Sequence, residues 1–406
     1  MVANSLRASF RDLSVSNVFV YVGDAVRADA IPAEFANQGA SVRTVASSTH
    51  SPASFASLAT GCYPPTHGVR SFNDRLPESL TRLFDLPGVD TRFLNSIFAY
   101  ATEYHGSDVD PIHSVLNTEP DAVSSPFEGL EPPFVTMERG PGGHAPYGDH
   151  TGTAVEYFED RGGDRQTIQA DYERSIELDI EVFESRIKEL AERGILEETL
   201  VIYTSDHGEL LGEGGALGHN DPMRPELVYV PTIFRHPDVP QETLGDTSFH
   251  HTDLFPTILT ALGRDADWDQ FDGKSLVEAL SDTPRPCFWE NQFLPDKIPG
   301  ISGRLGYEGV WDSGGGWVRT DSSRLDRYSV LLGKLFRSSK RRYMRRHIGE
   351  CFRSHWWGQQ TFGNPGFDDD QAQSVLERAK SDARRGERRD LSEAETERLR
   401  DLGYLN

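Results

Sequence analysis

The chain has 406 residues, of which 37% are hydrophobic and 26% charged, and its formal net charge is -23. This length is sufficient to bury one large hydrophobic core, and we expect a large domain together with a smaller one. No stretch of the sequence reaches the roughly 18 uncharged apolar residues of a membrane span, and the opening residues MVANSLRASFRDL lack the apolar segment of a secretory signal. We therefore expect a soluble cytoplasmic protein and exclude an integral membrane protein.

The surface is predicted to be strongly acidic. Asp and Glu number 64 against 41 Lys and Arg, and only six of these are Lys. Such a surface repels nucleic acid, which we exclude as a partner. An acid-rich, lysine-poor composition is also typical of a salt-loaded cytoplasm, where self-repulsion is screened, so we predict a halophilic source. The cysteines, Cys62, Cys287 and Cys351, form no CxxC pair and are expected to be free thiols.

Strands and helices are predicted to alternate along the first part of the chain. Residues 17–22 (NVFVYV) and 199–204 (TLVIYT) are continuous apolar runs, as in strands buried on both faces of a parallel sheet. Helical patterns cover residues 52–60, 78–86 and 169–193. This alternation predicts a layered α/β sheet.

Two irregular stretches indicate how the chain is organised. Residues 101–165 are rich in Gly, Pro, Asp and His and have weak periodicity, so we expect a long loop region that walls a site. The turn Phe-Asp-Gly at 271–273 follows a helical pattern and indicates a domain boundary close by. We therefore predict a catalytic domain over residues 1–268 and a smaller C-terminal domain over residues 269–406.

Acidic residues follow both predicted strands at the point where each strand ends. Asp24 follows the first strand, and Asp206 and His207 follow the second. Ligands gather beyond the carboxyl ends of strands in open α/β sheets, because loops and helix N-termini converge there. Two carboxylates and an imidazole make an incomplete shell for a divalent cation, and a hydroxyl could complete it. Taken singly, each Asp is also explained as a turn former or helix cap.

Ser51 is the candidate hydroxyl. The order Ser51-Pro52-Ala53-Ser54 is typical of a helix N-cap followed by proline at the first helical position. The same position lies where backbone N–H groups and the helix dipole favour an anion, so a nucleophilic oxygen there could attack a phosphate or sulfate. Both interpretations, cap and nucleophile, remain open at this point.

Several strings together resemble the sulfatase family of the alkaline phosphatase superfamily. In chain order they are VGDAVRAD (22–29), SPASFASLATGCYPPTHGV (51–69), TLVIYTSDHGELLGE (199–213), TDLFPTILTALG (252–263), FDGKSL (271–276) and LSEAETERLRDLGYL (391–405). The resemblance spans nearly the whole chain. It implies an alkaline-phosphatase-like three-layer α/β/α sandwich around a large mixed, mostly parallel sheet, with a smaller C-terminal α+β domain built on a short antiparallel sheet.

The resemblance also implies roles for individual residues. The implied metal ligands are Asp24, Asp206, His207 and Ser51. Ser51 falls on the position of the family's nucleophile. His144 falls on the histidine that contacts the substrate or the leaving group, and His219 on a position occupied by Lys or His. Asn73 matches an asparagine that contacts the esterified group.

Two departures from the family pattern concern the site. Many sulfatases have a second aspartate directly after the first, where this chain has Ala25. The motif that directs oxidation of the nucleophile to formylglycine ends in Arg, where this chain has Phe55. With Ala25, one of the family's metal ligands is absent. Phe55 argues against conversion of Ser51 to formylglycine and removes a guanidinium from the site. An unmodified serine resembles the phosphatase and phosphotransferase branches of the superfamily.

We expect one divalent cation rather than two. We recognise no second set of metal ligands in the sequence, although His250 and His251 could supply an imidazole. Their other interpretation is a loop histidine pair before a helix. A shell of nitrogen and oxygen favours manganese or zinc, whereas the resemblance to sulfatases favours calcium.

Residues 324–353 are unusually basic for this chain. They hold ten Lys or Arg against Asp326 and Glu350, and part of the segment reads as a basic amphipathic helix. Three interpretations are open: a solvated face, a patch for a polyanionic glycan or phospholipid head group, and a peripheral contact with a membrane surface or nucleic acid. Nucleic acid ranks last among these partners, because the acidic remainder of the surface would repel its phosphates.

The sequence thus predicts a sulfatase-like, metal-dependent hydrolase. It would cleave sulfuric ester bonds, or phosphate esters, in a small molecule or glycan by attack of residue 51. The first alternative is an unmodified-serine phosphoesterase or phosphotransferase. The second is a non-catalytic descendant that binds an anionic glycan or lipid, for which Ala25 and Phe55 are the best support.

Overall fold

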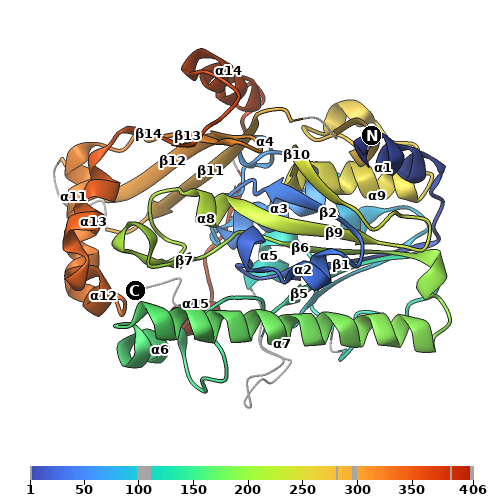
Figure 1. Cartoon of the computed structure of the whole chain (residues 1–406), viewed down its shortest axis with the longest axis horizontal. Helices are drawn as coiled ribbons and strands as arrows, with labels where there is room; N and C mark the ends of the chain where they lie inside the picture. The colour runs from blue at the N-terminus through green and yellow to red at the C-terminus, as the bar shows by residue number, and fades with distance from the viewer. Residues whose placement is uncertain are drawn as a thin grey trace.

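The structure is a computed structural model that describes residues 2–97, 111–121, 123–279, 282–294, 300–384 and 386–402. Its centre is a seven-stranded sheet in the order β10-β2-β9-β6-β1-β5-β4 (Figure 1). The strands are β1 (Asn17–Gly23), β2 (Ala40–Val45), β4 (Asp90–Asn95), β5 (Phe134–Gly140), β6 (Thr199–Ser205), β9 (Tyr229–Arg235) and β10 (Thr243–His250). Only β9 is antiparallel to its neighbours, so the sheet is mixed and mostly parallel.

Helices cover both faces of this sheet. The long helix α7 (Arg165–Glu192) runs beneath it in Figure 1, and α1 (Val2–Asp12), α3 (Ser51–Thr60) and α9 (Leu254–Ala261) lie above it. Strand β1 is buried on both sides. Val20 packs in the core between the sheet and the upper helices α3 and α9, whereas Phe19 packs in the core between the sheet and α7. The predicted three-layer α/β/α sandwich is confirmed, and β1 shows why its sequence is apolar at every position.

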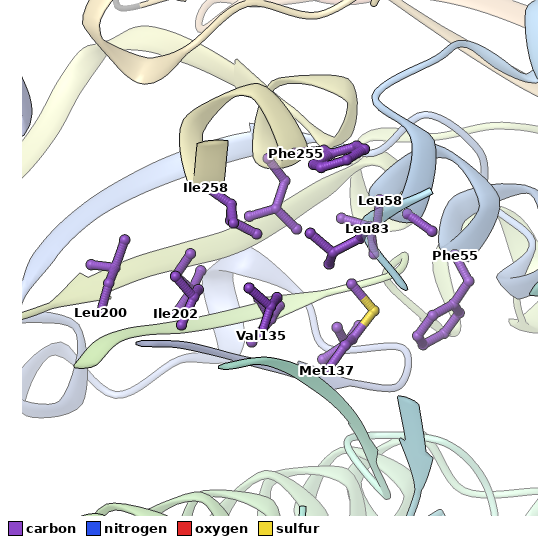
Figure 2. Close-up of a cluster of buried hydrophobic side chains, with 14 of the residues drawn as sticks. Phe55, Leu58, Leu83, Val135, Met137, Leu200, Ile202, Phe255 and Ile258 are labelled. Atoms are coloured by element: carbon purple, nitrogen blue, oxygen red, sulfur yellow. The ribbon is translucent and has the colours of Figure 1, made fainter. Parts of the chain in front are cut away.

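Figure 2 shows the core between the sheet and the upper helices. Val135 and Met137 from β5 and Leu200 and Ile202 from β6 face helical side chains. The helical side chains labelled there include Phe55, Leu58, Phe255 and Ile258. This packing fixes the N-terminus of α3 against the carboxyl ends of the central strands.

The C-terminal part is built on a second, antiparallel sheet. Its strands are β11 (Arg285–Gln292), β12 (Arg304–Trp311), β13 (Gly315–Arg319) and β14 (Gln359–Gly363). Its helices are α11 (Arg324–Arg337), α12 (Arg341–Arg346), α13 (Ile348–Trp356), α14 (Asp369–Ala379) and α15 (Glu393–Asp401). A smaller C-terminal α+β domain is therefore confirmed, whereas its boundary at residues 268 and 269 stays a prediction.

Short elements complete the described chain. The helices are α2 (Ala33–Ala36), α4 (Pro64–His67), α5 (Pro111–Leu116), α6 (Ala154–Arg161), α8 (Pro225–Val228) and α10 (Leu276–Ala279). The strands are β3 (Asp74–Arg75), β7 (Leu210–Leu211), β8 (Leu217–Gly218) and β15 (Glu387–Arg388). Cys62, Cys287 and Cys351 are free and buried, as predicted. Within the described ranges, no helix combines the length and the apolar character needed to cross a membrane.

Two predicted elements were wrong. Residues 101–165 are not one loop region, because their described part contains α5, β5 and α6, and β5 is a strand of the central sheet. Residues 98–110 lie outside the described residues. No α-helix forms over residues 78–86: Leu80 N–H donates to Pro77 in a turn, and a single 3-10 helical turn covers Leu83–Asp85. Burial of Leu83 in the core prevails over the helical pattern there.

Candidate active site

The two acidic strand ends meet at the edge of the sheet. Strands β1 and β6 are parallel neighbours whose last residues, Gly23 and Ser205, lie opposite each other. Asp24 and Asp206 therefore leave the sheet side by side. Ligand atoms of Asp24, Asp206 and His207 all lie within 4.8 Å of one another, and all three side chains are buried.

In the part of the chain that the structure describes, Asp24 and Asp206 each have one carboxylate oxygen with hydrogen-bond donors and one without. Asp206 Oδ1 accepts hydrogen bonds from the backbone N–H groups of Ala25 (3.0 Å) and His207 (2.9 Å). Asp24 Oδ2 accepts one from Arg139 Nε (2.9 Å). Among the described residues, no hydrogen-bond donor reaches Asp24 Oδ1 or Asp206 Oδ2. Buried, unpaired carboxylate oxygens are costly without a cation, so this donor set fits one divalent ion.

Ala25, in place of a second aspartate, contributes its backbone to the site. It has a φ of 56°, in the left-handed region that non-glycine residues rarely adopt. Its N–H donates to Asp206, and its carbonyl accepts from the Tyr172 hydroxyl (2.8 Å). The strained turn therefore directs the Ala25 N–H to the Asp206 carboxylate and helps to orient it.

Arg139 is a residue of the cluster that sequence reasoning missed. It lies on β5, is fully buried, and pairs with Asp24. Burial alone would raise the pKa of Asp24, but the charge and hydrogen bond of Arg139, together with His144 and His207, outweigh burial and lower that pKa to about 2. The guanidinium also lies 5.4 Å from the ring centre of Phe55. A guanidinium thus reaches the site from β5, although Phe55 of α3 stands where the sulfatase motif has its Arg. No local sequence pattern marks Arg139 as part of the site, because its partner Asp24 lies far away in the chain.

Ser51 is the first residue of α3, and His50 is the N-cap residue. The interpretation of Ser51 as the helix cap was therefore wrong. Its hydroxyl lies 3.1 Å from His207 Nε2. His207 Nδ1 lies 2.9 Å from the carbonyl oxygen of Gly208 and donates to it, which leaves Nε2 facing Ser51. This places the hydroxyl beside the predicted metal ligands.

His144 and His219 complete the cluster. The ring of His219 lies 4.5 Å from that of His207 and 5.6 Å from that of His144. Burial lowers the pKa of both His144 and His219, and the neighbouring imidazoles lower that of His219 further. His144 Nδ1 donates to the carbonyl of Ala145 (2.7 Å). Neutral imidazoles in this setting are suited to accept protons.

Glu209 is the second residue that sequence reasoning missed, although it stands in the quoted string TSDHGE. Glu209, His207 and His219 form another group of ligand atoms within 4.8 Å. Glu209 Oε2 lies 3.0 Å from His219 Nδ1, and Oε1 accepts from the Tyr147 hydroxyl (2.7 Å). Because both oxygens have protein partners, we interpret Glu209 as the residue that orients the His219 ring.

Three other candidates contact other parts of the chain. Asn73 bonds Ser71 and Arg389 through its backbone, and its contact with substrate stays a prediction. His251 Nε2 bonds the carbonyl of Ser205 (2.9 Å), and His250 Nε2 bonds that of Pro286 (2.9 Å). His250 is the last residue of β10 and His251 begins a 3-10 turn before α9, so the pair precedes a helix as expected but does not lie in a loop. Since protein groups bond the ring nitrogens of both, their supply of an imidazole to a second ion finds no support here.

A buried carboxylate fixes the loop that carries His144. Asp179 on α7 accepts hydrogen bonds from the hydroxyls of Tyr21 and Tyr203 (2.7 Å each) and from Gly142 N–H (2.8 Å). Gly142 has a φ of 55°, and a Cβ atom there would lie 2.0 Å from the carbonyl oxygen of Asp24. The loop therefore passes directly against the backbone of Asp24, which only glycine permits.

Asp179 should make the stability of the protein depend on pH. Burial raises its pKa to about 6, although hydrogen bonds from Tyr21 and Tyr203 oppose the shift. A raised pKa means that its favourable contribution is present below about pH 4 and is lost as the pH rises through about 6. Relative to Asp179→Asn, the wild-type free energy of unfolding should fall by up to about 3 kcal/mol over this range. Urea unfolding of both proteins at several pH values measures the difference, and parallel curves would contradict it.

The sandwich, its mixed sheet and the cluster at the sheet edge define an enzyme of the alkaline phosphatase superfamily. Residues 12–264 match the family model described as Sulfatase, and the chain belongs to the sulfatase family. It is 32% identical to the low-salt glycan biosynthesis sulfotransferase Agl7 of Haloferax volcanii, over 96% of each chain. It is also 31% identical to the extracellular sulfatase SULF-1 homolog of Drosophila melanogaster, over 32% of this chain and 11% of that one.

Solved structures agree on the fold. A 2-O GAG sulfatase matches with a TM-score of 0.57 at 14% identity, covering 92% of this chain and 98% of its own. The phosphonate monoester hydrolase of Agrobacterium radiobacter matches with a TM-score of 0.53 at 17% identity, covering 75% and 87%. At these identities the likeness concerns the fold alone, and it bears out the three-layer sandwich with its smaller C-terminal domain.

Proposed function

We propose that the enzyme takes the sulfuryl group of a sulfate ester onto an unmodified Ser51 and passes it to an acceptor hydroxyl, with one divalent cation bound by Asp24, Asp206 and His207. The observation that carries this proposal is the Ser51 hydroxyl 3.1 Å from His207 Nε2, in a cluster with two buried carboxylate oxygens that no donor of the described residues reaches. A nucleophile, a helix N-terminus and a cation shell thus occupy one place. The nitrogen in the shell favours manganese or zinc over calcium.

The residues have separable tasks in this reaction. When bound, the cation would polarise an ester oxygen and favour the deprotonated serine. Ser51 Oγ forms a bond to sulfur as the bond from sulfur to the leaving oxygen breaks, and the serine proton ends on that oxygen. His144 and His219 are neutral at rest and can carry protons at Nε2. Arg139 and the N-terminus of α3 offset negative charge on the transferred group.

The second step decides between hydrolysis and transfer. Water as acceptor would release sulfate, as a sulfatase does. A hydroxyl of a second molecule would make the enzyme a sulfotransferase, which is the word used for the Haloferax relative that matches nearly the whole chain. We therefore favour a glycan hydroxyl as the acceptor.

The test compares esters and acceptors under one set of conditions. Protein supplied with Mn²⁺, Zn²⁺ or Ca²⁺ is incubated with nitrophenyl sulfate or nitrophenyl phosphate, with and without an oligosaccharide acceptor. Release of nitrophenol together with a sulfated oligosaccharide supports transfer, and release of sulfate alone supports hydrolysis. Preference for the phosphate ester would contradict the sulfate proposal. No turnover with any ester would favour a protein that only binds anions.

Mass spectrometry of the peptide that contains Ser51 examines the nucleophile directly. An unmodified serine that gains the mass of SO₃ during turnover is the expected result. Formylglycine at this position would overturn the proposal of an unmodified nucleophile and leave the sulfatase assignment in place.

A further inference from the structure

Large apolar side chains are exposed almost exclusively in one region of the described chain. Seven of the eight such side chains lie between residues 325 and 357, and the eighth is Trp268. The seven are Leu325, Leu332, Phe336, Ile348, Phe352, Trp356 and Trp357. Phe336 has 71% of its surface exposed, and Trp356 has 46%. Single exposed apolar residues need no explanation, but a group of seven indicates an interaction site.

These side chains form two adjoining stripes. On α11, Leu325, Leu332 and Phe336 follow at helical spacing, and on α13 Ile348, Phe352 and Trp356 are each four residues apart. Tyr328 of α11 joins the stripes: its ring lies 5.6 Å from that of Phe352 and 6.3 Å from that of Trp356. In Figure 1 the two helices lie together at the left end of the molecule. We call these residues, with Trp357, the α11–α13 surface.

Arginines accompany the apolar stripes. Arg324 lies 5.1 Å from the ring centre of Trp356, and Arg345 lies 5.6 Å from that of Phe336. Arg337 and Arg353 are exposed beside Phe336 and Phe352. The whole chain carries a formal charge of -23, so this positive end would turn toward an anionic surface while the rest of the molecule is repelled.

The opposite sides of the same helices are firmly anchored. Leu331 and Leu335 of α11 pack with Met344 and Cys351 in a small buried core. Lys334 binds the Asp221 carboxylate (3.0 Å), two residues after His219. The exposed stripes are therefore not a displaced part of the core. They are the outer face of a platform whose inner face contacts the wall of the active site.

We propose that the α11–α13 surface binds the surface of a membrane that contains anionic lipids. Leucine and aromatic side chains on one face, flanked by arginines, are the composition of helices that lie in the interface between head groups and acyl chains. Indole rings favour that depth, and arginines pair with lipid phosphates. A second copy fits less well, because two such faces would bring their arginines together.

Vesicle sedimentation tests this proposal with the full chain. Wild-type protein should sediment with vesicles of phosphatidylglycerol and phosphatidylcholine, and much less with phosphatidylcholine alone. The double variant Phe336→Ser/Trp356→Ser should bind the anionic vesicles at least about tenfold more weakly. Arg337→Gln/Arg353→Gln should weaken binding to anionic vesicles only. Added salt should reduce binding without abolishing it, because the apolar contribution is not screened.

Trp268→Ser is the matched control, because Trp268 has the same 46% exposure as Trp356 but lies outside the surface. It should bind vesicles as the wild type does, and circular dichroism should give the same spectrum for all variants. Absence of wild-type binding to anionic vesicles would overturn the proposal. So would equal loss in Trp268→Ser, or a wild-type dimer, measured by light scattering, that Phe336→Ser/Trp356→Ser dissociates. The vesicles carry no glycan, so the result is independent of the catalytic proposal.

Discussion

Replacing Ser51 with alanine is expected to lower kcat for sulfate ester turnover by about a thousandfold or more, because the covalent route is lost. The other predicted metal ligands, Asp24, Asp206 and His207, stay in place, so binding of the ester should change little and KM should stay within a few fold. Initial rates with nitrophenyl sulfate, measured at saturating cation, give both constants. Metal content by elemental analysis should equal that of the wild type within about twofold, since the two carboxylates and His207 remain.

Ser54→Ala is the matched control in the same helix. The Ser54 side chain is also buried, but its hydroxyl donates to the carbonyl of Ser48 (2.9 Å) and not to the cluster. This variant should lose about 1 kcal/mol of stability and keep its turnover. If Ser51→Ala retained turnover within tenfold of the wild type, or if Ser54→Ala lost as much, Ser51 would not be the nucleophile.

The edge of the sheet was predictable from local sequence. The apolar runs of β1 and β6 indicate strands buried on both faces. Because the two strands pair in parallel, their carboxyl ends lie at the same edge of the sheet. Asp24, Asp206 and His207 follow those ends directly, so their proximity required no knowledge of distant contacts. The helices α3 and α7 were likewise visible in their own periodicity.

Strand β5 was hidden by the charges of its own residues. Glu138 and Arg139 interrupt an apolar run, and charged residues are rarely buried without partners. Their partners come from elsewhere in the chain: Arg186 of α7 binds Glu138 (2.8 Å), and Asp24 binds Arg139. A single sequence shows the charges but not the pairs, so Arg139 could not be assigned to the site before the fold was known.

The basic segment over residues 324–353 is helical, as predicted, but it forms three helices rather than one. One amphipathic helix was expected, whereas Ser338 and His347 separate α11, α12 and α13. The break lets α13 fold back against α11, which places Phe352 beside Tyr328. The packing of α13 against α11 joins the apolar stripes of the two helices into one continuous surface. The periodicity within each helix does not predict this packing.

Replacing Arg139 with methionine is expected to lower the free energy of unfolding by about 3–5 kcal/mol in the absence of added metal, because it leaves the buried Asp24 carboxylate without its partner. Turnover should fall as well, since a positive charge is removed beside the transferred group. The same change makes the cluster more negative. A divalent cation should therefore stabilise Arg139→Met more than it stabilises the wild type. Denaturant unfolding with and without Mn²⁺ measures both effects.

Arg186→Met separates this effect from the general cost of breaking a buried ion pair. Arg186 pairs with Glu138, whose side chain is fully buried, but the pair lies outside the cluster of Asp24, Asp206 and His207. Both variants should be destabilised, because each leaves a buried carboxylate unpaired. Only Arg139→Met should gain extra stabilisation from the cation. Equal responses of the two variants to Mn²⁺ would mean that the guanidinium of Arg139 does not adjoin a cation site, and the assignment of Asp24 as a ligand would fall with it.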